Sequence, residues 1–330
     1  MTNTATLARI IDGVEIPAAS LSFGIDWLSW AWQASATFPD IDAAQMLTGN
    51  PTEVLATING FQWRAILERP NTTRGFSDQE ASANGRSLAG WLAGPYAPLR
   101  SKTAEATRTA QQLCAEELPT GWGLEWLIDD WIVPGGTFSY TNLTAIEVIQ
   151  RIAAAAGAIV QADRQLRRVT VQRKWPAPPW AWGETNPDGT LPAAYIDSES
   201  VRAQPGEDFN AVLVHGDEPD GVMVRARING TAGDKHAPDI QDRLIVDALV
   251  GRHRAIQAMA DSRTHRTATL DMDLQAQPEG AGLLLPGTLL DLDETGAGYR
   301  ALVIGCQVTA NIESDFFINV TQQLEILIDG

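Results

Sequence analysis

Acidic side chains stand next to each other at two points of the chain, Asp129-Asp130 and Glu207-Asp208. Two carboxyl groups that flank a substrate can act as general acid and general base. Neighbouring residues of a strand point to opposite faces, so an adjacent pair cannot flank one substrate in this way. We therefore expect both pairs to be solvated surface groups.

A second acidic pattern, DLDETG over residues 291–296, resembles the start of a calcium-binding loop. Asp291, Asp293 and Gly296 occupy positions that such a loop uses. The twelfth position is Leu302 and not glutamate, so the bidentate ligand of the loop is missing. The pattern favours a strand–turn–strand connection over a calcium site.

The four histidines, His215, His236, His253 and His265, are further candidates for metal binding or proton transfer. No two of them stand at i and i+4, and the chain has neither an HExxH sequence nor a P-loop lysine motif. A GxSxG nucleophile elbow is also missing. The sequence predicts no catalytic, cofactor-binding or metal-binding residue, no cofactor and no enzyme activity.

The two cysteines, Cys114 and Cys306, are far apart in the sequence and form no CxxC pair. One chain therefore cannot supply a four-thiolate zinc or iron–sulfur site. Cys114 lies in a helical pattern and Cys306 in an apolar, strand-like run, so we expect two buried free thiols.

Tryptophans are concentrated in one part of the chain, since all eleven precede residue 183. In DWLSWAWQASATF, residues 26–38, the residues Trp30 and Trp32 continue a period-two pattern with alanines and a phenylalanine. This register predicts a strand that buries Trp30 and Trp32 in a β-domain core, with Trp27 at its edge. A protein interface and a carbohydrate platform are the alternatives.

Three more tryptophans, Trp175, Trp180 and Trp182, lie in or beside PAPPWAWGETNPDGTLPA, residues 176–193. This segment is too rich in proline and glycine for a central strand or a helix interior. We expect a linker or projecting loop whose tryptophans contact a partner protein.

A basic cluster follows a predicted turn and consists of Arg164, Arg167, Arg168, Arg173 and Lys174. It is conspicuous because the chain has 41 acidic and 24 basic residues, a net charge of −17. The cluster is interpreted either as hairpin surface or as a contact for an acidic partner, including a second copy of the chain.

Composition limits the remaining function classes. An acidic surface is unsuited to grip nucleic acid, although an acidic channel would let DNA pass without sticking. No apolar run approaches the ~20 residues of a membrane helix, and no secretory signal is visible. The sequence predicts a protein made in the cytoplasm, with about two domains in its 330 residues.

Secondary structure is legible in several segments. Asn59-Gly60 predicts a hairpin over residues 54–69, and residues 80–98 predict a strand that turns into a short helix near Ser87. Residues 102–118 predict a helix. A further helix is capped by Thr144 or Asn142 and ends at Gly157, before a 158–162 strand, a turn and a 166–173 strand.

The last part of the chain alternates strands with one helix, which we place at residues 250–266. The order β, α+β, β predicts a mainly β protein with two β-barrel domains that flank a mixed α/β domain. The expected boundaries are 1–100, 101–174, a 175–195 linker or loop, and 196–330.

Short motifs in these segments resemble the tail hub proteins of tailed phages, the group similar to late control protein D. The strand that ends in Gly85-Arg86-Ser87 and leads into a helical segment is similar to a step in that family. So is the module LTAIEVIQRIAAAAGAIVQAD followed by RRVTVQR. The alanine-rich helix near 255–260, LLLPGTLLDLD and the terminal VTQQLEILI also fit.

The resemblance implies a structural protein of the virion, a homotrimeric ring at the baseplate or tail tip that adapts a six-fold tube to a three-fold tip. Two tube-like β-barrel domains per chain would give the ring pseudo-six-fold symmetry. The implied partners are the tail tube, the distal tail protein and other tail-tip proteins, with assembly in the host cytoplasm. DNA would pass through the channel during genome ejection without specific binding.

The chain differs from the hub family in several features, and two other interpretations of its function remain. The iron–sulfur cysteines of some hubs are missing. We also expect no lysozyme domain and no long C-terminal extension, so spike and receptor functions would belong to other proteins. A hexameric distal-tail or tube-adaptor ring is the second interpretation, and a carbohydrate-binding protein is the third.

Overall fold

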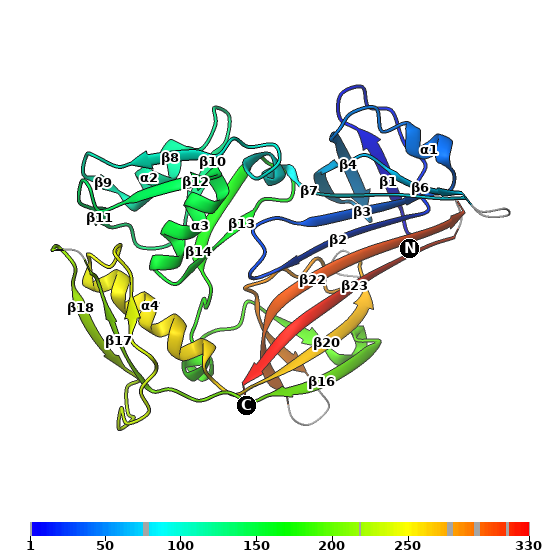
Figure 1. Ribbon diagram of the computed structural model, residues 1–330. Coiled ribbons are helices and arrows are strands. Elements are labelled where there is room, and N and C mark those ends of the chain that lie inside the picture. The colour runs from blue at the N-terminus through cyan, green and yellow to red at the C-terminus, as the bar shows by residue number, and fades with distance from the viewer. Residues whose placement is uncertain are drawn as a thin grey trace.

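A computed structural model of the chain describes residues 2–74, 79–217, 219–275, 280–293, 298–314 and 317–329 (Figure 1). Strands dominate it, which confirms the predicted mainly β class. A long, twisted sheet occupies one side of the molecule, and four smaller sheets of described strands with the longer helices form a lobe beside it (Figure 1).

The large sheet contains thirteen of the described strands. Its main path runs through β1 (Ala5–Arg9), β4 (Thr52–Ile58), β5 (Phe61–Leu67), β7 (Gln79–Ser87), β3 (Gln33–Phe38), β2 (Ser20–Asp26), β22 (Tyr299–Ser314), β23 (Phe317–Asp329), β20 (His265–Asp273) and β16 (Ser198–Gln204). Three strands join it at the side: β6 (Asn71–Arg74) pairs β7, β21 (Leu289–Asp293) pairs β22, and β15 (Gly189–Pro192) pairs β21.

The first and last parts of the chain meet inside this sheet. β2 pairs with β22 in antiparallel register from Ser20 opposite Asn311 to Asp26 opposite Gly305. One hydrophobic core lies against both halves and contains side chains as distant in sequence as Leu7 and Ile328. The described strands follow an open path from β1 to β16, and no closed barrel is found among them.

The neighbouring lobe is built from two separate stretches of sequence. One contributes the sheet β10 (Gly123–Trp126), β14 (Arg168–Arg173), β13 (Ala158–Ala162), the helices α2 (Ala110–Glu117) and α3 (Ala145–Ala155), and the short pairs β8 (Arg100–Thr103) with β12 (Ser139–Leu143) and β9 (Arg108–Thr109) with β11 (Ile132–Val133). The other contributes β17 (Ala211–His215), β18 (Met223–Arg227), β19 (Ile240–Gln241) and α4 (Ala248–Asp261).

These two stretches share one core, in which Ile149 and Val171 belong to the first and Val214 and Met259 to the second. Chain order therefore does not follow spatial order, since β16 lies in the large sheet and the next strand, β17, lies in the lobe.

Local sequence explains the elements that were predicted best. Asn59 and Gly60 adopt φ values of 47° and 83°, which a type I′ hairpin requires, and they connect β4 to β5. Thr144 and Glu147 form a capping box at the start of α3. Gly157, with φ 65°, follows the end of that helix.

The predicted helix over residues 102–118 is only half correct. Its first part forms β8 and β9, and α2 begins at Ala110. Thr109 is the N-cap and makes a capping box with Gln112, so a local hydrogen-bond pattern sets the start of the helix. The remaining short helices are α1 (Ile41–Gln45) and the 3₁₀ segments η1 (Leu88–Leu92), η2 (Pro179–Glu184) and η3 (Ala193–Tyr195).

Candidate assembly surface

The adjacent carboxylates have structural partners. Asp129 forms a 2.9 Å ion pair with Arg173, while Asp130 accepts a 3.0 Å hydrogen bond from the Gln111 amide at the start of α2. Asp208 accepts from the amide and the hydroxyl of Thr264. These hydrogen bonds, with that of the Thr264 amide the strongest cause, lower the pKa of the Asp208 carboxyl.

The histidines are spread over the structure. His253 Nε2 lies 3.1 Å from Arg173 Nη2 and 3.4 Å from an Asp129 oxygen. Burial and the Arg173 charge lower the pKa of His253, which favours the neutral ring. His265 is buried and stacks on Trp175 with ring centroids 5.4 Å apart. The described residues contain no group of three or more metal-binding side chains.

Both cysteines are buried free thiols, as predicted. Burial raises the pKa of Cys114, and raises that of Cys306 to about 12. Such thiols carry little thiolate and are unsuited to nucleophilic chemistry.

The calcium-like pattern begins inside a strand pair. Asp291 accepts a 2.9 Å hydrogen bond from Arg300 Nε, and β21 pairs with β22 from Leu289 opposite Leu302. These strands agree with the predicted strand–turn–strand connection. Its turn, including Gly296, lies outside the described residues.

Trp30 and Trp32 pack against two different hydrophobic cores. Trp32 is 3% exposed and belongs to the core of the large sheet, as predicted. The prediction for Trp30 is wrong: it is partly exposed, packs against the lobe core and lies under the Arg86 guanidinium at 5.8 Å. The period-two register fails there because β3 starts only at Gln33 and residues 27–32 form turns.

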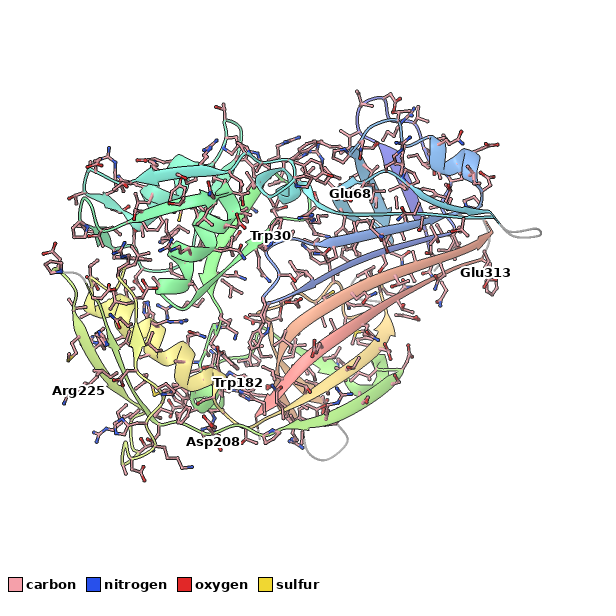
Figure 2. The ribbon with its side chains drawn as sticks, viewed as in Figure 1. Trp30, Glu68, Trp182, Asp208, Arg225 and Glu313 are labelled. Carbon is pink, nitrogen blue, oxygen red and sulfur yellow. The ribbon has the colours of Figure 1, made fainter. Side chains whose placement is uncertain are left out.

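Trp175 and Trp182 are also placed differently from the prediction. Their exposed fractions are 4% and 3%, because η2 folds the proline-rich segment back onto β22 and β23. Trp182 donates to the Ala177 carbonyl at 3.0 Å and Trp175 donates to Asp261 at 2.6 Å. Figure 2 labels Trp182 in the interior between the lobe and the sheet. Trp180 alone keeps partial exposure.

Most of the basic cluster is neutralised within the chain. Arg168 pairs with Asp163 at 2.6 Å, Arg173 with Asp129, and Lys174 with Asp261 at 2.9 Å. Arg167 pairs with Glu53, which joins the lobe to the large sheet. Because these four charges are neutralised within the chain, they no longer support the interpretation of the cluster as a contact for an acidic partner. Arg164 is the member of the cluster without such an ion pair among the described residues.

A polar face of the large sheet is a further surface feature of the described strands. Residues that pair across adjacent strands point to the same face. One row of such pairs crosses six strands through Asn84, Ser35, Ser22, Thr309, Thr321 and Asp273. A second row crosses seven strands through Arg86, Gln33, Gly24, Gln307, Gln323, Asp271 and Ser198.

Hydrogen bonds between strands order this face. Ser20 and Thr37 share one at 2.7 Å, and Gln307 donates to Ser22 at 3.2 Å. Asp271 accepts from both Gln323 and Ser198 at 2.7 Å. The face is thus mostly uncharged, with the cation Arg86 at its β7 end and acidic groups toward β20 and β23.

The end of the sheet at β16 is uncovered. All seven residues of β16 are exposed, and the strand pairs only with β20. Val201 is 52% exposed although it stands opposite Ala268, which is buried. An edge strand with free hydrogen-bonding groups and an uncovered apolar side chain is typical of a surface that pairs with another chain.

The polar face was not predicted from the sequence. Its signal is the alternation of Ser, Thr, Gln or Asn with apolar residues in SLSFGID, QASATF and QVTANI, all of which form strands of the sheet. The alternation identifies each strand as half-exposed, but only the register shows that the strands share one face.

No established protein family and no curated protein matches the chain by sequence. Solved structures do match. A tail protein from Neisseria meningitidis MC58 has a TM-score of 0.69 at 13% identity, with 100% of this chain and 97% of that chain covered.

Two other matches extend the comparison. The 43 kDa tail protein of prophage MuSo2 from Shewanella oneidensis gives a TM-score of 0.64 at 11% identity, covering 98% of this chain and 96% of that chain. The E. coli c3393 protein gives 0.55 at 8% identity, covering 98% and 77%. That protein is described as a type VI secretion component similar in structure to the T4 bacteriophage tail proteins gp27 and gp5. The chain therefore has the fold found in these phage-tail proteins.

Proposed function

We propose that the protein is a structural component of a phage tail, a hub-type ring of three copies at the tail tip or baseplate. The observation that carries the proposal is the similarity in fold to tail proteins over 97–100% of both chains in the first match. The function is structural and not enzymatic.

The polar face of the large sheet suits the wall of a DNA channel. It presents hydroxyl and amide groups and carries acidic residues such as Asp271, Asp273 and Glu325. Because DNA binding requires phosphate neutralisation by cations, a neutral-to-acidic wall lets DNA slide past. In this arrangement no residue of the face binds DNA specifically.

The edges of the sheet suit closure of the ring. β16 ends the path of the sheet, and β6 joins it at the side through β7. Each has one partner among the described strands, so both can continue the sheet into further copies. The first-half strands β2, β3 and β7 and the second-half strands β20, β22 and β23 are the two tube-like units of each chain. Three copies then supply six units that match a six-fold tail tube.

The partners in this assembly are the tail tube, the distal tail protein and other tail-tip proteins, and the assembled protein belongs to the virion. Assembly in the host cytoplasm and a place on the path of genome ejection follow from that role. No described helix is long and apolar enough to cross a membrane.

The test is the mass and rotational symmetry of the assembled particle, by light scattering and electron-microscopy averaging, alone and with tail tube protein. A three-fold ring with the polar face toward its axis supports the proposal. A six-fold ring replaces it with the distal-tail alternative. A chain that stays monomeric and binds no tube protein contradicts both.

The carbohydrate alternative loses support from the burial of Trp175 and Trp182, which a sugar platform would have to expose. Binding to a glycan array, lost in Trp180→Ala, would restore it.

A further inference from the structure

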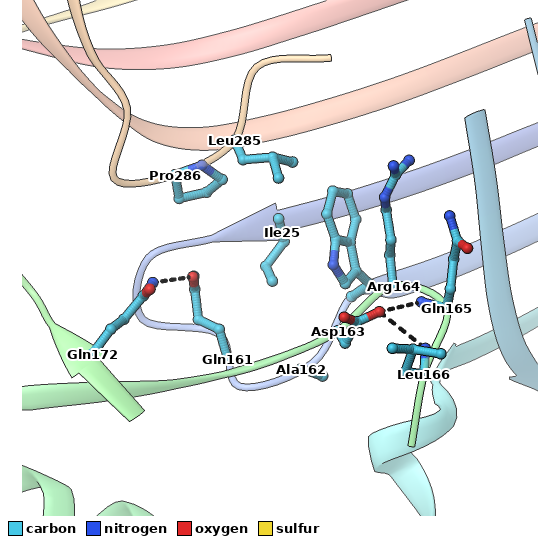
Figure 3. A pocket seen from close by; sticks show the side chains of 11 residues that line it. Ile25, Gln161, Ala162, Asp163, Arg164, Gln165, Leu166, Gln172, Leu285 and Pro286 are labelled. Carbon is cyan, nitrogen blue, oxygen red and sulfur yellow. Dashed lines mark hydrogen bonds between the residues drawn. The ribbon is translucent and has the colours of Figure 1, made fainter. Parts of the chain in front are cut away.

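A cavity of about 400 Å³ lies where the lobe meets the large sheet. One wall is the turn between β13 and β14, residues 163–166, and the opposite wall is Leu285 with Pro286 (Figure 3). Ile25 and Trp32 from the sheet complete its apolar lining. The hydrogen-bonded pair Gln161 and Gln172 closes one side (Figure 3).

Arg164 brings a positive charge into this cavity. Its guanidinium lies 5.8 Å from the centre of the Phe61 ring and 5.6 Å from that of Trp63. Among the described residues, no acceptor bonds its Nη1, which is buried. The Arg64 amide donates to the Arg164 carbonyl at 2.7 Å, so the backbone that carries the side chain is fixed to β5.

The neighbouring carboxylate is already engaged. Asp163 accepts from the amides of Gln165 and Leu166 at 2.8 and 2.9 Å and from Arg168 at 2.6 Å. It attracts Arg164 only through its charge, whereas burial lowers the pKa of the Arg164 guanidinium. The other four cations of the basic cluster each have a carboxylate partner. Among the described residues, Arg164 is thus a half-buried cation without a carboxylate ion-pair partner.

We propose that this cavity is a binding site for a carboxylate with an apolar group attached, held by Arg164. A carboxylate in the cavity supplies the counterion that the Arg164 guanidinium lacks among the described residues, and charged hydrogen bonds of this kind are the strong ones. Leu166 is 52% exposed and Leu285 38% exposed at the mouth, so they contact the apolar part of the ligand.

The carboxylate has two sources, an acidic side chain in an extended segment of another protein or a free organic acid. The site does not depend on the role in a phage tail, because it rests on the cavity and on Arg164 alone.

The experiment compares two matched pairs of probes by calorimetric titration at low ionic strength. Acetyl-Leu-Glu-Leu-amide is set against acetyl-Leu-Gln-Leu-amide, and phenylacetate against phenylacetamide. We expect each acid to bind about tenfold or more tightly than its neutral partner. If the peptide acid binds more tightly than phenylacetate, the ligand is a protein segment. If phenylacetate binds more tightly than the peptide acid, the ligand is a free acid.

Variants link the preference to the site. Arg164→Gln should remove the preference for the acids, and Arg266→Gln, at an exposed position near the start of β20, should keep it. If Arg164→Gln does not fold, Gln165→Glu places a like charge in the cavity wall and should weaken only the acids. Equal affinity for acids and amides, no binding by either acid, or a preference that survives Arg164→Gln would each overturn the proposal.

Discussion

Gln322 holds the backbone of Leu284, whose amide donates a 2.9 Å hydrogen bond to the Gln322 side-chain oxygen. The Gln322 amide group donates to the Gly282 carbonyl at 3.1 Å, and the side chain is fully buried. A single buried glutamine thus ties the segment before β21 to β23.

Replacement Gln322→Leu should leave the Leu284 amide and the Gly282 carbonyl without these partners. Buried polar groups that lose a partner cost about 1–3 kcal/mol each, so we expect the free energy of unfolding to fall by about 2–4 kcal/mol. Urea denaturation measures it. Gln323→Leu, one residue along on the exposed face, is the matched control and should cost about 1 kcal/mol or less. Equal losses for the two variants would contradict the role of Gln322.

Trp182→Ala should destabilise the protein. The side chain is buried between Trp175 and the sheet, and truncation of a buried tryptophan costs about 3–5 kcal/mol. Trp180→Ala removes a partly exposed ring and should cost clearly less. Thermal denaturation of the two variants compares them. A smaller loss for Trp182 than for Trp180 would show that the η2 segment does not pack as described.

The capping box of α3 should make stability depend on pH. The Thr144 amide and hydroxyl hydrogen-bond to Glu147, and they lower the pKa of its carboxyl below the ordinary 4.5. The unfolded chain then binds more protons than the folded chain as the pH falls through 4.5, so the stabilisation present above that pH is lost toward the lower, folded pKa.

The measurement is the free energy of unfolding of the wild type and of Glu147→Gln across this range. The wild type should be more stable by about 1 kcal/mol near pH 6, and the gap should narrow as the pH falls below 4.5. The α2 box offers a control because its partner Gln112 does not titrate. The cost of Gln112→Ala should stay constant with pH, and a gap for Glu147→Gln that widens in acid would refute the assignment.

Glu53 should stabilise the folded chain by connecting the sheet to the lobe. Its carboxylate pairs with Arg167 and Arg64 and accepts from Trp91 Nε1 at 2.9 Å. Glu53→Gln removes both ion pairs and should cost about 1–2 kcal/mol, since the group is 22% exposed. Asp129→Asn, whose pair with Arg173 is nearly half-exposed, should cost about 0.5 kcal/mol. Chemical denaturation should rank the variants in this order.

Val201→Lys should impair assembly without impairing folding. Val201 is 52% exposed on the edge strand β16, so the charge costs the single chain little. If β16 is buried in an interface between copies, the same lysine would have to be desolvated, which costs free energy and weakens assembly. Analytical ultracentrifugation should show fewer assembled particles at an unchanged melting temperature. Met223→Lys, 65% exposed on β18, is the control and should assemble normally.

Sequence patterns predicted elements whose shape depends on neighbouring residues. Asn59-Gly60 and the Thr144 cap followed by Gly157 are correct because turn and cap chemistry acts within a few residues. Trp30 and Trp182 were placed incorrectly because their burial depends on packing between segments remote in sequence. The polar face and the cavity around Arg164 also depend on segments remote in sequence, because the strand register creates the face and the position of the lobe creates the cavity.

β2 cannot acquire its partner β22 until the ribosome has made almost the whole chain. Ser22 and Thr309, which face each other in that pairing, are 287 residues apart. At ~5–20 residues per second the interval is roughly 14–57 s, during which one edge of β2 has no partner strand. Leu21, Phe23 and Ile25 alternate along this strand and are buried in the finished protein. The pairing of β2 with β22 therefore forms late in synthesis, and a nascent chain stalled before β22 would present an aggregation-prone edge to chaperones and proteases.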